Sequence, residues 1–256
     1  MDLTRDEEAR LIACLMETGQ LLLECGAEIS RVEDTLTRIG TAYGGVMNVF
    51  VIPSLITITM NYPDRESITE TRRIRSYGTT DFYRLEKLNA LSRECCAKPI
   101  PIAEFRERLY KIAAGKKPLP AVLVGSILGA GGFAVFFGGN LWDGLVSAVF
   151  GAIICLLQGR IGRTELNTAA ANMLVSLMIG LGVGLVSKLI PVLHMDKILI
   201  GDIMLLIPGL TMTNAIRNIL VGNTISGVVR LAETIIWAAA LAGGFMMALA
   251  IVNLIP

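Results

Sequence analysis

Charge and histidine are scarce in this sequence. Only 18% of the 256 residues are charged, against roughly 25% in soluble globular domains. An ordinary soluble enzyme is therefore disfavoured, and the net charge of +1 indicates neither a nucleic-acid-binding protein nor an acidic tail. Intrinsic disorder is excluded as well, because 53% of the residues are apolar and the mean hydropathy is +0.61.

Cysteine is too sparse for a disulfide scaffold. The five cysteines form no CxxC pair, and the single histidine, His194, is distant from them in the sequence. A zinc site needs about four such ligands at characteristic spacing. We therefore expect no metal and no cofactor, and the free thiols suit a reducing compartment.

The N-terminus lacks the pattern of a signal peptide. Residues 1–8 are mainly acidic, whereas a signal peptide opens with basic residues and continues with apolar ones. We expect the first half of the chain to stay in the cytosol and the first membrane segment to be internal.

Charge divides the chain into two parts. Residues 1–117 contain 17 Lys or Arg and 17 Asp or Glu, whereas residues 118–256 contain 6 and 5. Glycine has the opposite distribution, with 7 in the first part and 19 in the second. This division predicts a cytosolic domain over 1–117 and a transmembrane domain over 118–256.

The first part has both helical and strand patterns. Apolar residues at intervals of three, four or seven predict one helix of about 35 residues, beginning at Thr4 with Glu7 as its capping-box partner. Alternation with a period of two predicts strands. The expected strands are 46–52, 55–62 and a weaker 66–74, and the expected helices that follow are 80–96 and 101–114. This order predicts an α+β domain.

The second part contains five apolar segments, each near the length of about 20 residues that a transmembrane helix needs. They cover 119–137, 141–158, 167–190, 198–216 and 230–254. The predicted fold class is therefore an α-helical membrane protein, with five transmembrane helices preceded by the cytosolic domain.

Basic residues in the short loops predict the orientation. Seven lie on the side of the N-terminal domain, and two, Lys188 and Lys197, lie on the other side. The seven are Lys111, Lys116, Lys117, Arg160, Arg163, Arg217 and Arg230. We therefore expect an inner-membrane protein with its N-terminal domain inside and its C-terminus outside.

The fourth apolar segment is the most informative one, because Pro208-Gly209 interrupts it. A broken helix is tolerated in a membrane where it faces protein or a wet cavity, and such helices bind substrates in transporters. Helix N-terminal amides and the side chains of Thr211, Thr213 and Asn214 would then contact the substrate. The alternative is a simple proline kink whose threonines bond to their own backbone.

Four charged residues are candidates for recognition or ion coupling. Asp202 lies well inside the fourth segment, where it could accept a proton or bind a cation; alternatively it lies at the outer interface near Lys197. Arg217 and Arg230 could recognise an anion at the cytosolic mouth, or they could only signal topology. Glu233 could take part in coupling or simply pair with Arg230.

A carboxylate pair for hydrolysis is conceivable among Glu24, Glu28 and their neighbours. No histidine, GxSxG sequence or phosphate loop accompanies them, and spacings of four and three residues fit surface pairing of Glu24, Glu28 and Arg31 on one helix. We therefore expect a protein that is not an enzyme.

Two stretches of the sequence are distinctive. One is G-Q-L-L-L-E-C-G-A-E-I-S-R-V-E, from Gly19 to Glu33, followed by the strand pair around Pro53-Ser54. The other runs from Pro208-Gly209-Leu210 through Arg217 to Gly222 and Arg230. Together they resemble the threonine/serine exporter family. The similarity covers nearly the whole chain and is greatest to the short form of the family, which has a cytosolic domain and five spans.

The resemblance implies gradient-driven export of a small metabolite. Long members are associated with threonine and serine, and two-subunit members with dicarboxylates such as succinate. The resemblance also implies a second small membrane subunit as partner. We expect the protein to form an oligomer and to bind no nucleic acid. The rival interpretations are a membrane-anchored regulatory or hydrolytic domain, and a channel without gradient coupling.

Overall fold

The computed structural model describes residues 3–62, 65–74, 80–115, 118–161 and 166–254. Contacts divide the chain into two compact units. The first unit comprises Met1–Lys117 and Thr211–Leu231, and the second comprises Pro118–Leu210 and Ala232–Pro256. Most of the chain is helical, as expected. The predicted cytosolic placement of 1–117 stays a prediction.

The first unit begins with two helices, where the sequence pattern predicted one. Helix α1 (Arg5–Glu24) starts at Thr4 with the expected capping box to Glu7, and α2 covers Ile29–Ala42. Gly26 separates them with a φ of 77°, a left-handed conformation that glycine adopts readily. Its amide donates to the Leu23 carbonyl and the Ala27 amide donates to the Leu22 carbonyl, the paired bonds of a Schellman helix end. The prediction of one long helix was therefore wrong.

A three-stranded antiparallel sheet follows, in the order β1-β2-β3. Its strands are β1 (Val46–Ile52), β2 (Leu55–Tyr62) and β3 (Arg65–Arg73), which confirms the predicted strands. Ile56, Ile58 and Met60 are buried. On the other face, the hydroxyls of Thr59 and Thr69 lie 2.9 Å apart. The period of two thus divides β2 into a core face and a polar face.

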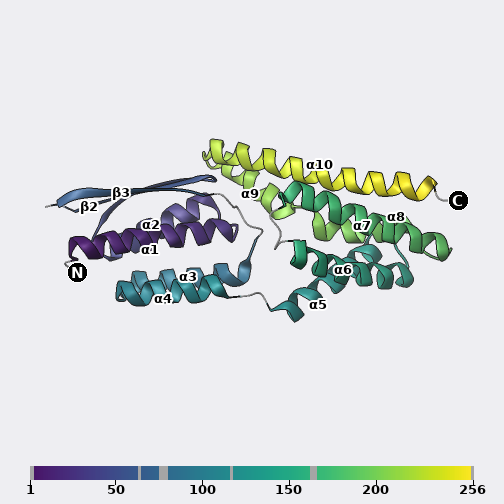
Figure 1. Ribbon diagram of the computed structural model, residues 1–256, viewed down its shortest axis with the longest axis horizontal. Helices are drawn as coiled ribbons and strands as arrows, with labels where there is room; N and C mark the ends of the chain where they lie inside the picture. Colours follow the sequence, from purple (N-terminus) through teal and green to yellow (C-terminus); the bar gives the residue numbers. More distant parts are fainter. Residues whose placement is uncertain (1–2, 63–64, 75–79, 116–117, 162–165, 255–256) are drawn as a thin grey trace. The chain divides into compact units, whose positions relative to one another are not determined.

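Helices α1 and α2 lie between the sheet and the helices α3 (Phe82–Ala97) and α4 (Ile102–Ala114) (Figure 1). The core of the first unit is formed by apolar side chains from all three layers, including Leu11, Leu36, Ile56 and Phe105, none of which has exposed surface. This burial is the main favourable contribution to the stability of the layers.

The remaining helices are α5 (Leu119–Phe136), α6 (Leu141–Ile161), α7 (Thr168–Leu189), α8 (Met195–Leu206), α9 (Gly209–Leu220) and α10 (Thr224–Leu254). Among the described residues, four helices (α5, α6, α7 and α10) are long and apolar enough to cross a membrane, and the bent pair α8–α9 makes up to five. The five apolar segments thus form helices at the expected places. Helix α10 begins six residues before the expected start at 230.

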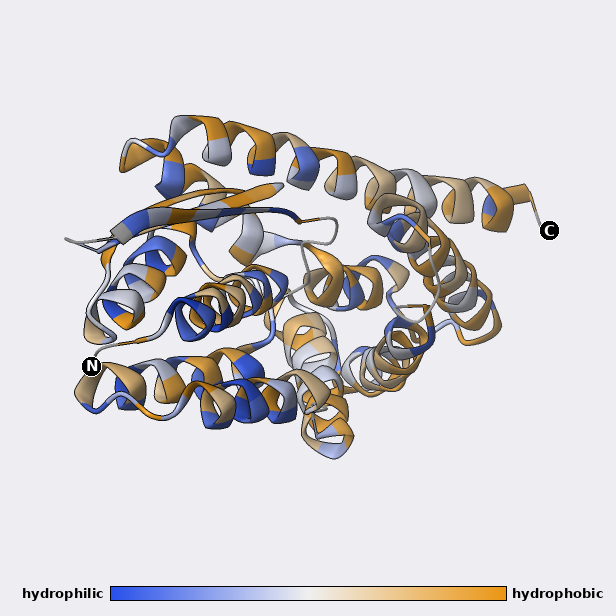
Figure 2. Cartoon of the chain, turned by 60° about the vertical axis from the view of Figure 1, so that its left-hand side comes forward, coloured by the Kyte–Doolittle hydropathy of each residue, from blue (hydrophilic) through white to orange (hydrophobic). Residues whose placement is uncertain are grey.

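The second unit exposes apolar side chains, as helices in contact with lipid do. Its helices are mostly orange or pale in Figure 2, where orange marks hydrophobic residues. Inside the unit, small residues bring helices close together. A Cβ on Gly201 of α8 would lie 2.6 Å from both the Ala130 carbonyl oxygen of α5 and the Ser147 hydroxyl of α6. Helix α8 therefore packs tightly against α5 and α6.

Candidate functional site

The predicted break in the fourth span is confirmed. Helix α8 ends at Leu206, α9 begins at Gly209, and the two helices are bent by 52°. Pro208 has no amide to donate, and the Gly209 amide donates to the Ile207 carbonyl at 2.8 Å. The Gly209 amide is therefore engaged in the turn, so free N-terminal amides would have to come from later residues of α9. Among the described residues beyond the adjoining backbone, no heavy atom lies within 4 Å of the position that a Gly209 Cβ would take.

A small cavity lies beside α9 in the first unit. The predicted site residues Thr211 and Asn214 of α9 and Arg230 of α10 line it, together with Ala215 and Asn218. The opposite wall is formed by residues Gly26, Ala27, Glu28 and Thr80. Its volume is about 20 Å³, which is enough for about one water molecule. Polar residues that are distant in sequence thus meet here, but a metabolite needs a larger opening.

Arg217 binds a carboxylate of its own chain. Its Nη1 donates a hydrogen bond to Oε1 of Glu28 at 2.5 Å. The expected single helix with Glu24, Glu28 and Arg31 on its surface was wrong, because the Schellman turn at Gly26 ends α1 between Glu24 and Glu28. Glu24 instead accepts a hydrogen bond from Gln20 at 2.8 Å.

The other predicted binding residues lie outside this cavity. Thr213 and Gly209 are exposed, Pro208 is half-buried, and none of the three lines the cavity. Glu233 is half-buried on α10, one helical turn after Arg230. Only part of the predicted set is therefore brought together.

Asp202 is fully buried in the second unit, on α8. Its Oδ1 accepts a hydrogen bond from the Ser147 hydroxyl of α6 at 2.8 Å. Its Oδ2 has no hydrogen-bond partner within the described part of the chain. A buried acidic group with an unsatisfied oxygen is a candidate functional group, and the depth of Asp202 in the membrane stays a prediction.

Asp143 is a second buried carboxylate, and the sequence interpretation did not single it out. Its side chain accepts hydrogen bonds from the amides of Asn140 at 2.8 Å and His194 at 2.7 Å, and Oδ2 lies 2.9 Å from Nδ1 of His194. These bonds join the start of α6 to the residue that precedes α8. Both oxygens are therefore engaged, which indicates a structural role. The available sequence signal was the Asn-x-x-Asp spacing at a helix start.

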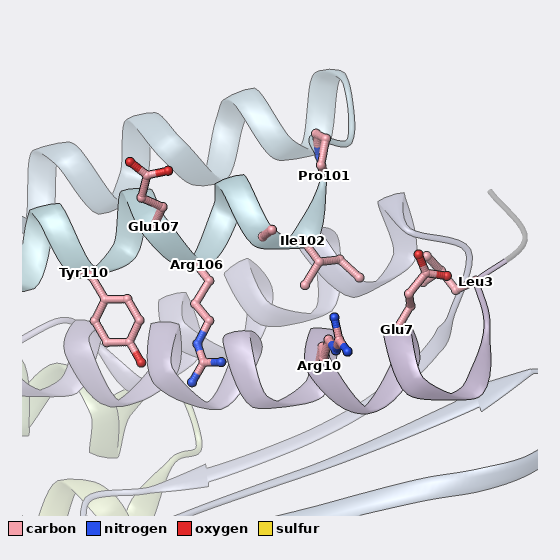
Figure 3. A pocket seen from close by; sticks show the side chains of 9 residues that line it. Leu3, Glu7, Arg10, Pro101, Ile102, Arg106, Glu107 and Tyr110 are labelled. Atoms are coloured by element: carbon pink, nitrogen blue, oxygen red, sulfur yellow. The ribbon is translucent and has the colours of Figure 1, made fainter.

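A larger groove of about 580 Å³ lies between α1 and α4 (Figure 3). Leu3, Pro101 and Ile102 contribute apolar surface, and Arg106 and Tyr110 lie along the same groove. Its charged side chains have local partners: Arg10 pairs with Asp6, Arg106 with Glu17, and Glu107 with Lys111. The groove contains none of the predicted site residues, and its charges point to no particular ligand.

Across the described ranges, no group of three or more His, Cys, Asp or Glu side chains is arranged to hold a metal ion. The residues that remain are suited to binding an anion, at Arg217 and Arg230, and to holding a proton or a cation, at Asp202.

The fold and these sites define a multi-pass helical membrane protein with a broken span, an arrangement typical of transporters. The family described as "Putative threonine/serine exporter" (ThrE) matches residues 13–252, so the chain belongs to the threonine/serine exporter family. This match confirms the resemblance. The family is one of transporters. No curated protein and no solved structure matches the chain.

Proposed function

We propose that the chain is a subunit of a secondary exporter that moves small carboxylates, either threonine and serine or a succinate-like dicarboxylate, and is driven by an ion gradient. The observation that carries this proposal is Asp202, a fully buried carboxyl group with one unpartnered oxygen among the described residues, on the helix that precedes the break. A membrane anchor needs no such group, because burying it is costly.

The substrate carboxylate binds near α9. Arg217 and Arg230 supply guanidinium groups, which match the geometry of a carboxylate, and Thr211 and Asn214 supply polar contacts in the cavity. The break at Pro208 and Gly209 leaves open space at the start of α9. Thr213 lies on the same helix. Asp202 and Glu233 carry the coupled proton or cation.

Transport requires another conformation of this region. The cavity beside α9 holds about 20 Å³, and alternating access in transporters moves helices around a central site. The structure is therefore consistent with a state in which the site is closed around its own side chains.

The working unit includes a second small membrane subunit and several copies of each chain, in the inner membrane. Similarity to the short form of the family supports the partner. The excess of basic residues, seven against two, supports an N-terminal domain in the cytosol and a C-terminus outside.

The test is transport in reconstituted vesicles, with and without the partner. Labelled succinate, threonine and serine are offered under an imposed proton or sodium gradient, and uphill movement of at least one is expected. Asp202→Asn should abolish uphill movement. The matched control is Asp196→Asn on the same helix, because Asp196 is exposed and pairs with Lys197.

Absence of movement for all three substrates in the presence of the partner would contradict the proposal and favour an anchored regulatory or hydrolytic domain. Downhill movement alone would indicate a channel without gradient coupling.

A further inference from the structure

The acidic residue that meets Arg217 belongs to the turn between α1 and α2. We infer that Glu28 is an internal competitor of the substrate: its carboxylate occupies the anion-binding position at Arg217, and a substrate carboxylate must displace it. This inference rests on the proposed function, because that proposal identifies Arg217 as a substrate-binding residue.

The position of Glu28 is not explained by helix capping. Glu28 is the N-cap residue of α2, but its side chain makes no capping hydrogen bond. Ser, Thr, Asp and Asn are the usual residues at this position because their short side chains reach the first amides of the helix. The Glu28 side chain extends instead to Arg217.

The chemistry of the contact is that of the ligand proposed for the site. A guanidinium group donates to a carboxylate oxygen at 2.5 Å, as it would to succinate or to the carboxylate of threonine. Glu28 also lines the cavity that Arg230 and Asn214 line. Glu28 thus lies in a lining that also includes the guanidinium of Arg230, and its carboxylate is bonded to Arg217. A free carboxylate would replace Glu28 without changing the net charge of the occupied site.

The contact is weak enough to be displaced. The Arg217 side chain is 62% exposed and that of Glu28 is 20% exposed, and exposed ion pairs are worth little because water screens them. An internal competitor of this strength lowers the apparent affinity for a carboxylate by about two- to six-fold. It therefore sets a threshold for substrate concentration and does not block the site.

Displacement has a structural consequence in the first unit. Glu28 joins the α1–α2 turn to α9, so its release removes an ion pair between the turn and the helix that carries Arg217. The layered helices and sheet would then respond to the substrate through the loss of this ion pair.

The test is equilibrium binding of labelled succinate and threonine to the full-length chain, purified with any membrane subunit that accompanies it. Glu28→Gln should tighten succinate binding by about two- to six-fold. The control Glu24→Gln, at the end of α1 just before the turn and bonded to Gln20, should leave binding unchanged. Arg217→Gln should weaken binding, and adding Glu28→Gln to it should bring no gain.

A charge-swapped variant, Glu28→Arg with Arg217→Glu, covers the case in which Glu28→Gln does not fold. It keeps an ion pair but removes the guanidinium from position 217, so we expect succinate binding no tighter than that of Arg217→Gln. Binding equal to that of the unaltered chain would overturn the inference.

An unchanged or weaker affinity in Glu28→Gln, or no succinate binding by either protein, would also overturn it. Tighter binding by Glu28→Gln without transport in vesicles would support the inference and contradict the exporter proposal. Transport in vesicles, together with no effect of Glu28→Gln on binding, would support the exporter proposal and contradict the inference.

Discussion

The Ser147 hydroxyl on α6 donates a hydrogen bond to Oδ1 of Asp202 on α8 at 2.8 Å, and neither residue has exposed surface. This bond joins two helices inside the second unit, next to the close approach of Gly201 to α6. The other oxygen of this carboxyl group, Oδ2, has no hydrogen-bond partner in the described part of the chain. Loss of the bond to Ser147 should therefore have a measurable effect on stability.

We expect Ser147→Ala to destabilise the protein by about 1–3 kcal/mol, because it leaves a buried acceptor unsatisfied. In an Asp202→Leu background the same change should cost much less, since position 202 then has no carboxyl oxygen to leave unsatisfied. The measurement is reversible unfolding in detergent. The control is Ser187→Ala: the Ser187 hydroxyl is buried without a partner in the described ranges, so its removal should be neutral or stabilising. Equal losses at both serines would contradict the argument.

Gly209→Val tests the break in the fourth span. We expect it to abolish transport of all substrates, because a branched side chain would fill the open space at the start of α9. Folding should be retained, since the described residues outside the local backbone place no heavy atom within 4 Å of the new Cβ. Gly243→Val on α10 is the matched control, because that position is equally open. Normal transport by well-folded, monodisperse Gly209→Val protein would show that the break is only a packing kink.

Gly26→Ala tests the turn that carries Glu28. Alanine is strained at a φ of 77°, and its Cβ would lie 3.2 Å from the Thr80 backbone. We expect a loss of more than about 1 kcal/mol in the free energy of unfolding. Gly159→Ala, in a helix with open space around it, should be neutral or stabilising by up to about 1 kcal/mol. Similar behaviour of the two variants would exclude strain at Gly26.

Thiol labelling of intact cells tests the orientation. Burial raises the pKa of Cys14 and of Cys95 to about 11, so both thiols stay protonated and slow to react well above neutral pH. After Cys96→Ser removes the half-buried thiol, Val192→Cys should react with an impermeant maleimide and Gly159→Cys should not. The opposite labelling pattern would overturn the predicted orientation.

The same thiols predict a pH dependence. A thiol has an ordinary pKa of 9.0, and in both cysteines burial raises the pKa to about 11. The folded state therefore holds these protons more tightly than the unfolded state, and stability should fall as the pH rises from 9 to 11. Alkylation of Cys14 and Cys95 should accelerate over the same range.

Local patterns were sufficient for most elements. The alternation in Leu55–Tyr62 predicted β2 because one face of the strand is buried and the other is polar. The capping box at Thr4 and Glu7 could be predicted because all its partners lie within four residues. The turn at Gly26 could not be predicted from the sequence pattern. Apolar side chains before and after it, such as Leu22 and Ile29, enter the same core, so they continue the helical spacing across the break.

The candidate site was predicted in part. Arg217, Arg230, Thr211 and Asn214 were identified because polar residues are conspicuous in an apolar segment. The partner of Arg217 was not identified from the sequence, because Glu28 is separated from Arg217 by 189 positions. Ser147 was also missed, since one serine in an apolar helix carries no signal of which neighbour it will contact.

Hydrophobic periodicity and the missing proline amide act over a few residues, so the chain's order of residues was enough to predict the apolar helices, the strands of the sheet and the break at Pro208. The contacts of Glu28 with Arg217, of Asp202 with Ser147 and of Asp143 with His194 became known only from the folded chain. Those contacts depend on how the helices pack. Packing places side chains next to one another even when they are far apart in the sequence, so sequence spacing does not predict which of them meet.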